Sequence, residues 1–540
     1  MITLLEVLSG ARPLDFVMLK APLTIGAGIF LIWLWVDRNA VRHMQSWMAW
    51  VNADPRRHRA LAMGIIVIWT IFFCYLKAQQ QKWFKTGLDL AIYASLAWHM
   101  VHGPLFYDSI LDRNLLGHHF SPIFLVIGLL YRLYEDPMML MVLQTIGLGA
   151  GAVALYLIAV RILGYTGWTI AALLLYLFHF YLHIAHHIEF HTSLLGIPIL
   201  LWLLYFAERS ARIPVLLCAA LAMTVEEVVV MGVAAVGLYL AFFNRTLRAV
   251  GIVCAVVACL QFALVVGVVM PAINHEPGGH LLWSRYEHLG ASFSEALENL
   301  LRHPVSALNQ AFVQGNRWYY VLALVGSFGF LPVLAWRQAL FAALPILLLL
   351  LNRNPSQYKL GFHYSAAALP LLYYSMVYGL AALRDLLTRY HTESQLRLRL
   401  AGSFTLVLLA ANILQIPGYN LSRVDSGYVD LRRSALAKIP ERVSVAASSA
   451  LVTQLVNRDH ICYVTWRPGE LCFWGAPEYV ILELGARRDP NLAPGDELRY
   501  VDSLVTDLGY TILHQGSDLV ILHGHEKLGP EFAPAPSRYT

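Results

Sequence analysis

The sequence predicts an all-α polytopic membrane protein with about twelve transmembrane helices and a small C-terminal α/β domain outside the membrane. Hydrophobic residues make up 58% of the 540 residues and charged residues only 14%, whereas soluble domains carry about 25% charged residues. Apolar runs near the length that a bilayer core requires recur along most of the chain. After about residue 418 the pattern changes to short β-branched runs separated by Pro, Gly and Asp.

Twelve apolar segments are candidate membrane spans. In lipid they must be helical, because every backbone polar group has to pair internally. The candidate spans are 22–36, 60–76, 138–160, 167–184, 193–207, 213–226, 228–243, 249–271, 318–335, 338–351, 363–383 and 400–417. A further apolar stretch, 120–134, is too short to cross comfortably.

The basic residues indicate which side each loop faces. Arg-rich linkers occupy 37–59, 208–212, 244–248 and 384–399, and positive residues in short loops stay cytoplasmic. All four linkers fall on the cytoplasmic side only if 120–134 lies along the outer interface as an amphipathic helix. In that topology the extracytoplasmic parts are 77–137, 185–192, the turn near 226–227, 272–317, 352–362 and everything after about residue 418.

The chain therefore divides into four predicted parts: an N-terminal extra span with its Arg-rich cytoplasmic linker (1–59), a transmembrane domain (60–417) with its first outer loop at 77–137, an extracytoplasmic α/β domain (418–525) and a loose tail (526–540). Strands are expected at 443–446, 479–482 and 518–522, and a helix within 498–510.

Two further composition features bear on partners and compartment. The net charge of +5 owes much to Arg beside apolar runs, which indicates membrane topology, so no nucleic-acid partner is expected. Cys462 and Cys472 flank the turn 467–470, and a disulfide between them would form if that segment faces an oxidising space.

Ionisable residues at the outer ends of the spans are the candidate site. Asp89 opens the apolar stretch 90–98, where it is either a first-turn acid of a helix or a functional residue. His118 and His119 can hold a metal, bind a phosphate or simply lie at the surface. Glu226 and Glu227 interrupt a long apolar run, where they mark a tight outer turn or face a polar cavity.

Two more segments carry polar candidates. His183, His187 and His191 follow one another at i, i+4 spacing, which would align them only if the whole segment were helical, so the zinc signal is weak. Arg353 and Lys359 can counter a lipid phosphate or form a basic turn at the headgroups. We expect all these groups to converge in one polar cavity that opens outward.

The same residues resemble the motifs of a bacterial family of predicted membrane proteins, domain of unknown function 2079. The motifs are Leu88–Tyr93, Asn114–Ile123, Glu189–His191 followed by Pro198, Glu226–Glu227, Phe362–Tyr364, Val443–Ala446, Asn457–Arg458, Glu478–Glu483 and Gly509–Tyr510. The resemblance covers roughly residues 65–525. It departs from the expected pattern at Leu88, at His118, where an Asp is expected, and at Val225, where a basic residue is expected.

That family is in turn similar to the GT-C superfamily of glycosyltransferases. The resemblance implies a GT-C-like body, an interfacial helix in the first outer loop, a catalytic Asp at Asp89 and a polyprenyl-phosphate sugar donor. The expected reaction is sugar transfer to a carbohydrate, lipid or protein acceptor at the outer face of the bacterial cytoplasmic membrane.

The residues receive expected roles in this reaction. Asp89 is the general base, and Glu226 or Glu227 orients an imidazole, holds a divalent cation (Mg or Mn) or binds sugar hydroxyls. Substrate and phosphate binding is assigned to His118, His119, His191, Arg353, Lys359, His363 and Tyr364. A possible metal set is Asp89, His119 and Glu226.

Two alternatives from other classes stay open. A transporter or lipid-handling protein would use the same cavity for passage, although the sequence shows no internal repeat. A catalytically inactive GT-C-like module would only bind lipid or a partner, and the departures at His118 and Val225 keep this reading open.

Overall fold

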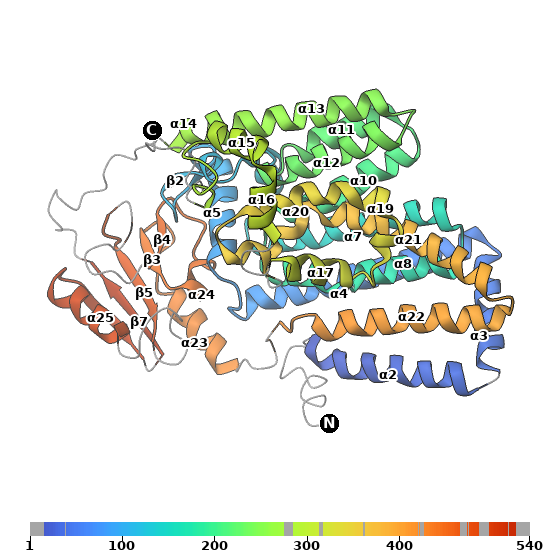
Figure 1. Ribbon diagram of the computed structural model, residues 1–540. Coiled ribbons are helices and arrows are strands. Elements are labelled where there is room, and N and C mark those ends of the chain that lie inside the picture. Colours follow the sequence, from blue (N-terminus) through green and yellow to red (C-terminus); the bar gives the residue numbers. More distant parts are fainter. Residues whose placement is uncertain are drawn as a thin grey trace.

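The computed structural model shows a bundle of helices with a mixed β-sheet at one end (Figure 1). The structure describes residues 16–37, 39–274, 285–312, 317–359, 362–419, 421, 426–464, 472, 475–484, 496–516 and 518–524. The predicted tail 526–540 and the turn 467–470 lie outside the described residues.

The bundle is built from helices of very different lengths. In chain order they are α2 (Phe16–Val36), α3 (Ala40–Asn52), α4 (Pro55–Lys82), α5 (Leu88–His102), α6 (Phe124–Tyr131), α7 (Met138–Leu163), α8 (Gly167–Leu177), α9 (Phe180–His187), α10 (Gly196–Glu208), α11 (Arg212–Ala222), α12 (Glu227–Phe243), α13 (Arg248–Leu264), α14 (Met270–Asn274), α15 (Phe293–Arg302), α16 (Pro304–Phe312), α17 (Trp318–Gly326), α18 (Leu331–Leu334), α19 (Trp336–Ala339), α20 (Ala343–Leu351), α21 (Leu369–Tyr390) and α22 (Ser394–Gln415). Short 3₁₀ turns include η1 (Leu115–Gly117), η2 (Thr192–Leu195) and η8 (His363–Ala367).

The prediction of a mostly helical chain with several membrane-capable helices is confirmed. Within the described residues, six helical segments are long and apolar enough to cross a membrane: Phe16–Val36, Pro55–Lys82, Met138–Leu163, Gly167–His187, Arg248–Ile273 and Ser394–Gln415. The remaining apolar helices α10, α11, α12 and the run through α19 and α20 are shorter. A count of twelve complete spans therefore stays a prediction.

Some predicted spans are not continuous helices, and the segment 318–335 is one of them. In the segment 318–335, α17 ends at Gly326 and α18 begins only at Leu331. Between them Gly329 and Phe330 have φ values of 61° and 56°, which an α-helix does not contain. A single unbroken helix does not form here, because apolar composition does not reveal where the backbone turns, and whether the segment crosses the membrane stays a prediction.

The segment 120–134 forms only the short helix α6. Its 8 residues extend about 12 Å at 1.5 Å per residue, against a hydrocarbon core of about 30 Å. Leu125, Val126 and Leu129 are exposed on its surface. A helix of this length does not cross the bilayer by itself, and its position along the interface stays a prediction.

The start of the first outer loop also differs from expectation. Helix α4 continues through Lys82, so the segment 77–82, expected outside the span, is its last turn and a half. The loop proper carries α5, the two-residue strands β1 (Tyr107–Asp108) and β2 (Arg113–Asn114), η1 and α6. This loop lies between the bundle and the C-terminal sheet (Figure 1).

Small residues allow α12 and α13 to pack closely. A methyl group at Gly237 of α12 would lie 2.6 Å from the Ala255 amide of α13, and one at Gly251 would lie 2.6 Å from the Ala241 amide. Contacts this close between helix backbones require glycine at both positions. They set how closely α12 packs against α13.

The C-terminal residues form a five-stranded mixed sheet in the order β4–β3–β5–β7–β6. The strands are β3 (Val445–Ala447), β4 (Ile461–Tyr463), β5 (Tyr479–Glu483), β6 (Thr511–Gln515) and β7 (Leu519–His523), with helices α23 (Ser426–Leu436), α24 (Ser449–Val452) and α25 (Asp496–Thr506). β3 is parallel to β4 and β5, whereas β7 is antiparallel to β5 and β6. The expected strands overlap β3, β5 and β7; β4 and β6 were not expected.

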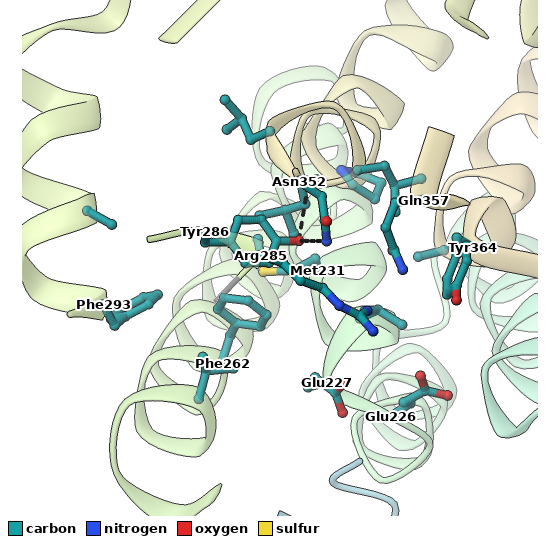
Figure 2. A pocket seen from close by; sticks show the side chains of 18 of the residues that line it. Glu226, Glu227, Met231, Phe262, Arg285, Tyr286, Phe293, Asn352, Gln357 and Tyr364 are labelled. Carbon is teal, nitrogen blue, oxygen red and sulfur yellow. Dashed lines mark hydrogen bonds between the residues drawn. The ribbon is translucent and has the colours of Figure 1, made fainter. Parts of the chain in front are cut away.

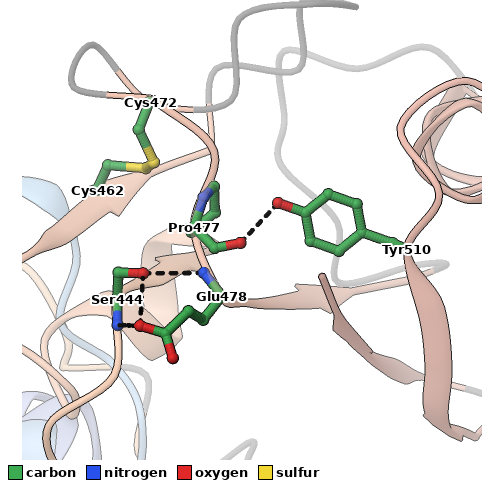
Figure 3. The surroundings of a disulfide bond; sticks show 6 residues. All are labelled: Ser444, Cys462, Cys472, Pro477, Glu478 and Tyr510. Carbon is green, nitrogen blue, oxygen red and sulfur yellow. Dashed lines mark hydrogen bonds between the residues drawn. A yellow bond between two sulfur atoms is a disulfide. The ribbon is translucent and has the colours of Figure 1, made fainter. Parts of the chain in front are cut away.

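A disulfide closes one edge of this sheet. Cys462 of β4 is bonded to Cys472, with their Cα atoms 5.7 Å apart (Figure 3). Beside it the Glu478 amide donates to the Ser444 hydroxyl at 2.9 Å, so the chains entering β3 and β5 are tied together. The disulfide that the sequence left conditional is therefore present in the structure.

Candidate active site

Asp89 lies in the first turn of α5 but does not cap that helix. The cap is the carboxylate of Glu189, which accepts hydrogen bonds from the Gly87 amide and, at 2.6 Å, from the Leu90 amide. The Asp89 side chain is 54% exposed, and its Oδ2 lies 3.2 Å from His191 Nε2. This hydrogen bond from His191 holds the pKa of Asp89 below its ordinary value, although burial opposes the shift. The carboxylate is thus held ionised at an accessible position.

Glu189 belongs to the candidate site, although the sequence reasoning did not select it. It has a positive φ of 25° and lies between the end of α9 and η2. Burial raises its pKa to about 7, while the amides of Leu90 and Gly87 act in the opposite direction. The only sequence signal was its place in the motif Glu189–His191, which pointed to His191.

A stacked pair of imidazoles extends from Asp89 into the protein. The ring of His191 lies 3.6 Å, centroid to centroid, from the ring of His363. The backbone amide of His191 donates to Gln144 Oε1 at 2.8 Å, and its Nδ1 lies 3.3 Å from the Ile188 carbonyl oxygen. These contacts fix the ring that orients Asp89.

A second cluster forms around the acidic pair. His119 Nδ1 lies 3.1 Å from Glu227 Oε1 and 3.4 Å from Glu226 Oε1. The Phe120 amide donates to the other Glu227 oxygen at 3.0 Å. Burial lowers the pKa of His119, but the charges of Glu227 and Glu226 outweigh it and raise the pKa above the ordinary value.

This cluster has the composition of a metal site. One ligand atom from each of His119, Glu226 and Glu227 can be chosen so that all three lie within 4.8 Å of one another. Glu226 is 4% exposed, and among the described residues its Oε2 has no hydrogen-bond partner. A buried carboxylate oxygen without a partner is costly unless a cation or water satisfies it. The expected set grouped Asp89 with His119 and Glu226; the structure brings Glu227 to this cluster and joins Asp89 to His191.

A cavity of about 380 Å³ adjoins the acidic pair. Its polar lining includes His119, Glu226, Glu227, Arg285, Asn352, Gln357, His363 and Tyr364. The rest is largely apolar and comes mainly from α12, α13, α15 and α20, with Phe262, Phe293, Leu297 and Leu348 among its residues. Figure 2 shows the Arg285 side chain directed toward the region where Glu226, Glu227 and Tyr364 lie. The cavity wall is therefore largely apolar, with charged groups of both signs in its lining.

Arg285 is the arginine found among the described residues that line this cavity, and the sequence reasoning missed it. Arg353 and Lys359 are exposed and are not among the lining residues. The Arg353 amide instead donates to the Arg285 carbonyl at 2.9 Å, which helps to place Arg285. Nothing in the sequence separates Arg285 from other basic residues of the long outer segment 272–317.

Two other histidine expectations have definite outcomes. His118 packs edge-on against the ring of His119, 4.5 Å between centroids, but is not among the cavity-lining residues. The helical alignment of all three histidines, which the sequence left conditional, does not form, because α9 ends at His187 and Ile188 is extended. His183 points elsewhere, with its Nε2 2.7 Å from the Leu177 carbonyl oxygen.

Comparisons with known proteins give the following matches. A family model described as "Predicted membrane protein (DUF2079)" matches residues 80–521. No curated protein matches the chain. The chain is similar to the crystal structure of ArnT from Cupriavidus metallidurans bound to undecaprenyl phosphate, with 12% identity and a TM-score of 0.49, over 86% of this chain and 99% of that chain. For the apo structure of the same protein the values are 10%, 0.48, 86% and 98%.

Proposed function

The chain belongs to the DUF2079 family of predicted membrane proteins, and from this premise and the geometry of its site we propose that it transfers a sugar from a polyprenyl-phosphate donor to an acceptor. The proposal rests on two features that lie next to each other, the Asp89–His191 pair and the apolar cavity. An ionised, accessible Asp89 is held by His191, and His191 stacks on His363 at the wall of an apolar cavity that also contains Arg285.

The reaction assigns each group a task. The acceptor hydroxyl gives its proton to Asp89 as its oxygen forms a bond to the anomeric carbon. The bond from that carbon to the phosphate oxygen breaks, and the polyprenyl phosphate leaves with the electron pair. Arg285 stabilises the phosphate charge as a guanidinium with several directed donors. His191 keeps the Asp89 carboxylate oriented, and His363 and Tyr364 contact the sugar between them.

We also propose that the site and the C-terminal sheet, as an α/β domain, face the extracytoplasmic side. The disulfide between Cys462 and Cys472 supports this, because disulfides persist in oxidising compartments. Helix α3, which lies within the Arg-rich linker 37–59, is at the end of the bundle opposite the sheet (Figure 1), as the positive-inside rule requires. The donor would then enter its cavity from the outer leaflet.

The test of the proposal is transfer by the purified full-length chain in right-side-out vesicles, supplied with undecaprenyl phosphate carrying a series of radiolabelled sugars. Arg285→Ala is expected to reduce kcat/KM for the donor by about 10- to 100-fold, since a charge-assisted contact contributes about 1.5–3 kcal/mol. Arg285→Lys should recover part of the loss.

The matched control is Arg302→Ala, which removes an exposed arginine on α15 that pairs with Glu298 and should leave transfer unchanged. A large loss of kcat/KM in Arg353→Ala with none in Arg285→Ala would indicate that Arg353, the residue expected from the sequence, binds the phosphate. Movement of labelled lipid or sugar across the vesicle membrane without product would favour a transporter instead.

A divalent cation is a further part of this proposal. His119, Glu226 and Glu227 would hold it, and an imidazole with two carboxylates suits Mn²⁺ well. Bound there, the cation would supply positive charge beside the phosphate leaving group.

We expect electron paramagnetic resonance to show that Mn²⁺ binds the full-length chain. Glu226→Gln should weaken this binding at least about tenfold. The readout is independent of transfer. Glu298→Gln, which changes an exposed carboxylate of α15, is the control. Equal Mn²⁺ affinity in the wild type and Glu226→Gln would show that the cluster is a buried ion pair and not a metal site.

A further inference from the structure

A segment of the C-terminal part lies along helix α5, which carries Asp89. This segment, residues 449–460, consists of α24 and the chain that follows it, and we call it the clamp segment. α24 contacts α5 and lies between the sheet and the bundle (Figure 1). Farther along, Asn457 accepts a hydrogen bond from the Tyr131 hydroxyl of α6 at 2.8 Å. The Asp459 backbone bonds to His99 near the other end of α5. The clamp segment therefore follows α5 over most of its length.

A buried polar ring joins the clamp segment to the chain that enters α5. The Thr86 hydroxyl donates to Gln81 Oε1 at 2.7 Å. Having used its single proton, it accepts from the Thr453 hydroxyl at 3.0 Å. Gln454 Nε2 closes the ring by donating to the Gln81 carbonyl at 2.8 Å. Gln81, Thr86 and Thr453 are all buried, where the loss of one partner leaves another without its bond.

The ring acts on the turn that precedes Asp89. Thr86 is followed directly by Gly87, whose amide binds Glu189. A methyl group at Gly87 would lie 3.1 Å from Glu189 Oε1 and 3.1 Å from Ser449 Oγ. The first turn of α5 is therefore held between Glu189 on one side and the clamp segment on the other.

We propose that the C-terminal part of the chain positions the reacting carboxylate, with Thr453 as a positioning residue that acts on Asp89 through Thr86 and the first turn of α5. The inference rests on the proposed function for its catalytic meaning. The hydroxyls of Thr453 and Thr86 are occupied by each other and by Gln81, so they are suited to holding the turn rather than to contacting substrate. The Asp89–His191 contact of 3.2 Å is the distance that they maintain.

The activity test uses Thr453→Val, which removes the hydroxyl at nearly constant volume. We expect kcat to fall about 10- to 100-fold with KM for the lipid donor unchanged, because small misplacements of a reacting group carry costs of this size. Thr453→Ser keeps the hydroxyl and should restore kcat. Thr511→Val, which removes an exposed hydroxyl of β6 bonded to the His523 carbonyl, is the control. Unchanged kcat in Thr453→Val, or a loss that serine does not restore, overturns the positioning role.

A second readout does not depend on transfer. Hydrogen exchange measured by mass spectrometry on the full-length chain should show faster exchange in peptides covering 84–95 in Thr453→Val but not in Thr511→Val, since exchange reports local opening. If the wild type transfers no sugar but exchange over 84–95 is faster in Thr453→Val, the role of the clamp segment is supported and the proposed function is refuted. If exchange over 84–95 is unchanged, the clamp itself is refuted.

Discussion

Replacing Asp89 with Asn is expected to lower kcat for sugar transfer by about 10²–10⁴-fold, the range over which a general base contributes. Asparagine is nearly the same size and can still meet His191 at the 3.2 Å position, but it accepts no proton from the acceptor hydroxyl. Binding of undecaprenyl phosphate should stay unchanged, because Asp89 is not among the residues that line the cavity. The measurements are single-turnover transfer and lipid binding on the same purified preparation.

The control for this substitution is Asp430→Asn, an exposed carboxylate on α23, which should transfer sugar at the wild-type rate. Full activity in Asp89→Asn would remove the base from the reaction. Loss of both transfer and lipid binding would instead indicate that the substitution disturbs the first turn of α5, and Glu189 would become the next residue to test.

The largest expected loss of stability comes from Arg432→Leu. Arg432 is fully buried, and its Nε and Nη2 lie 2.8 and 2.5 Å from Glu483 Oε1. The Tyr428 hydroxyl donates to the same oxygen at 3.0 Å. Removing the guanidinium leaves a buried carboxylate without its counter-charge, which costs about 3–5 kcal/mol. We expect the C-terminal part to become sensitive to protease in pulse proteolysis of the full-length chain.

Two variants test the cause of that loss. Arg442→Leu changes an exposed arginine of the same part of the chain and should leave protease resistance unchanged. Arg432→Leu combined with Glu483→Leu removes both charges and should recover part of the stability, because a well-packed apolar pair avoids the desolvation cost. Protease resistance equal to the wild type in Arg432→Leu alone would mean that solvent or a shifted side chain reaches Glu483.

Much of the fold followed from local properties of the sequence. Each candidate span overlaps at least one helix, since runs of apolar residues in lipid leave the backbone no alternative to helix. The strands β3, β5 and β7 were found because their β-branched residues are buried. β6 is an exposed edge strand without a buried pattern. β4 is as short as β3, and its sequence did not mark it as a strand. The family suggested by the motifs is confirmed by the match over residues 80–521.

The sequence by itself determined the membrane class, the helices and the residue types that are candidates for the site. Only the tertiary structure decided which of these groups meet: Asp89 with His191, His119 with Glu226 and Glu227, and Arg285 with the cavity. The reason is that a membrane helix forms because of the apolar residues within its own segment. Contacts between charged side chains depend on the directions in which distant turns leave their helices, and these directions are set by packing that one sequence does not reveal.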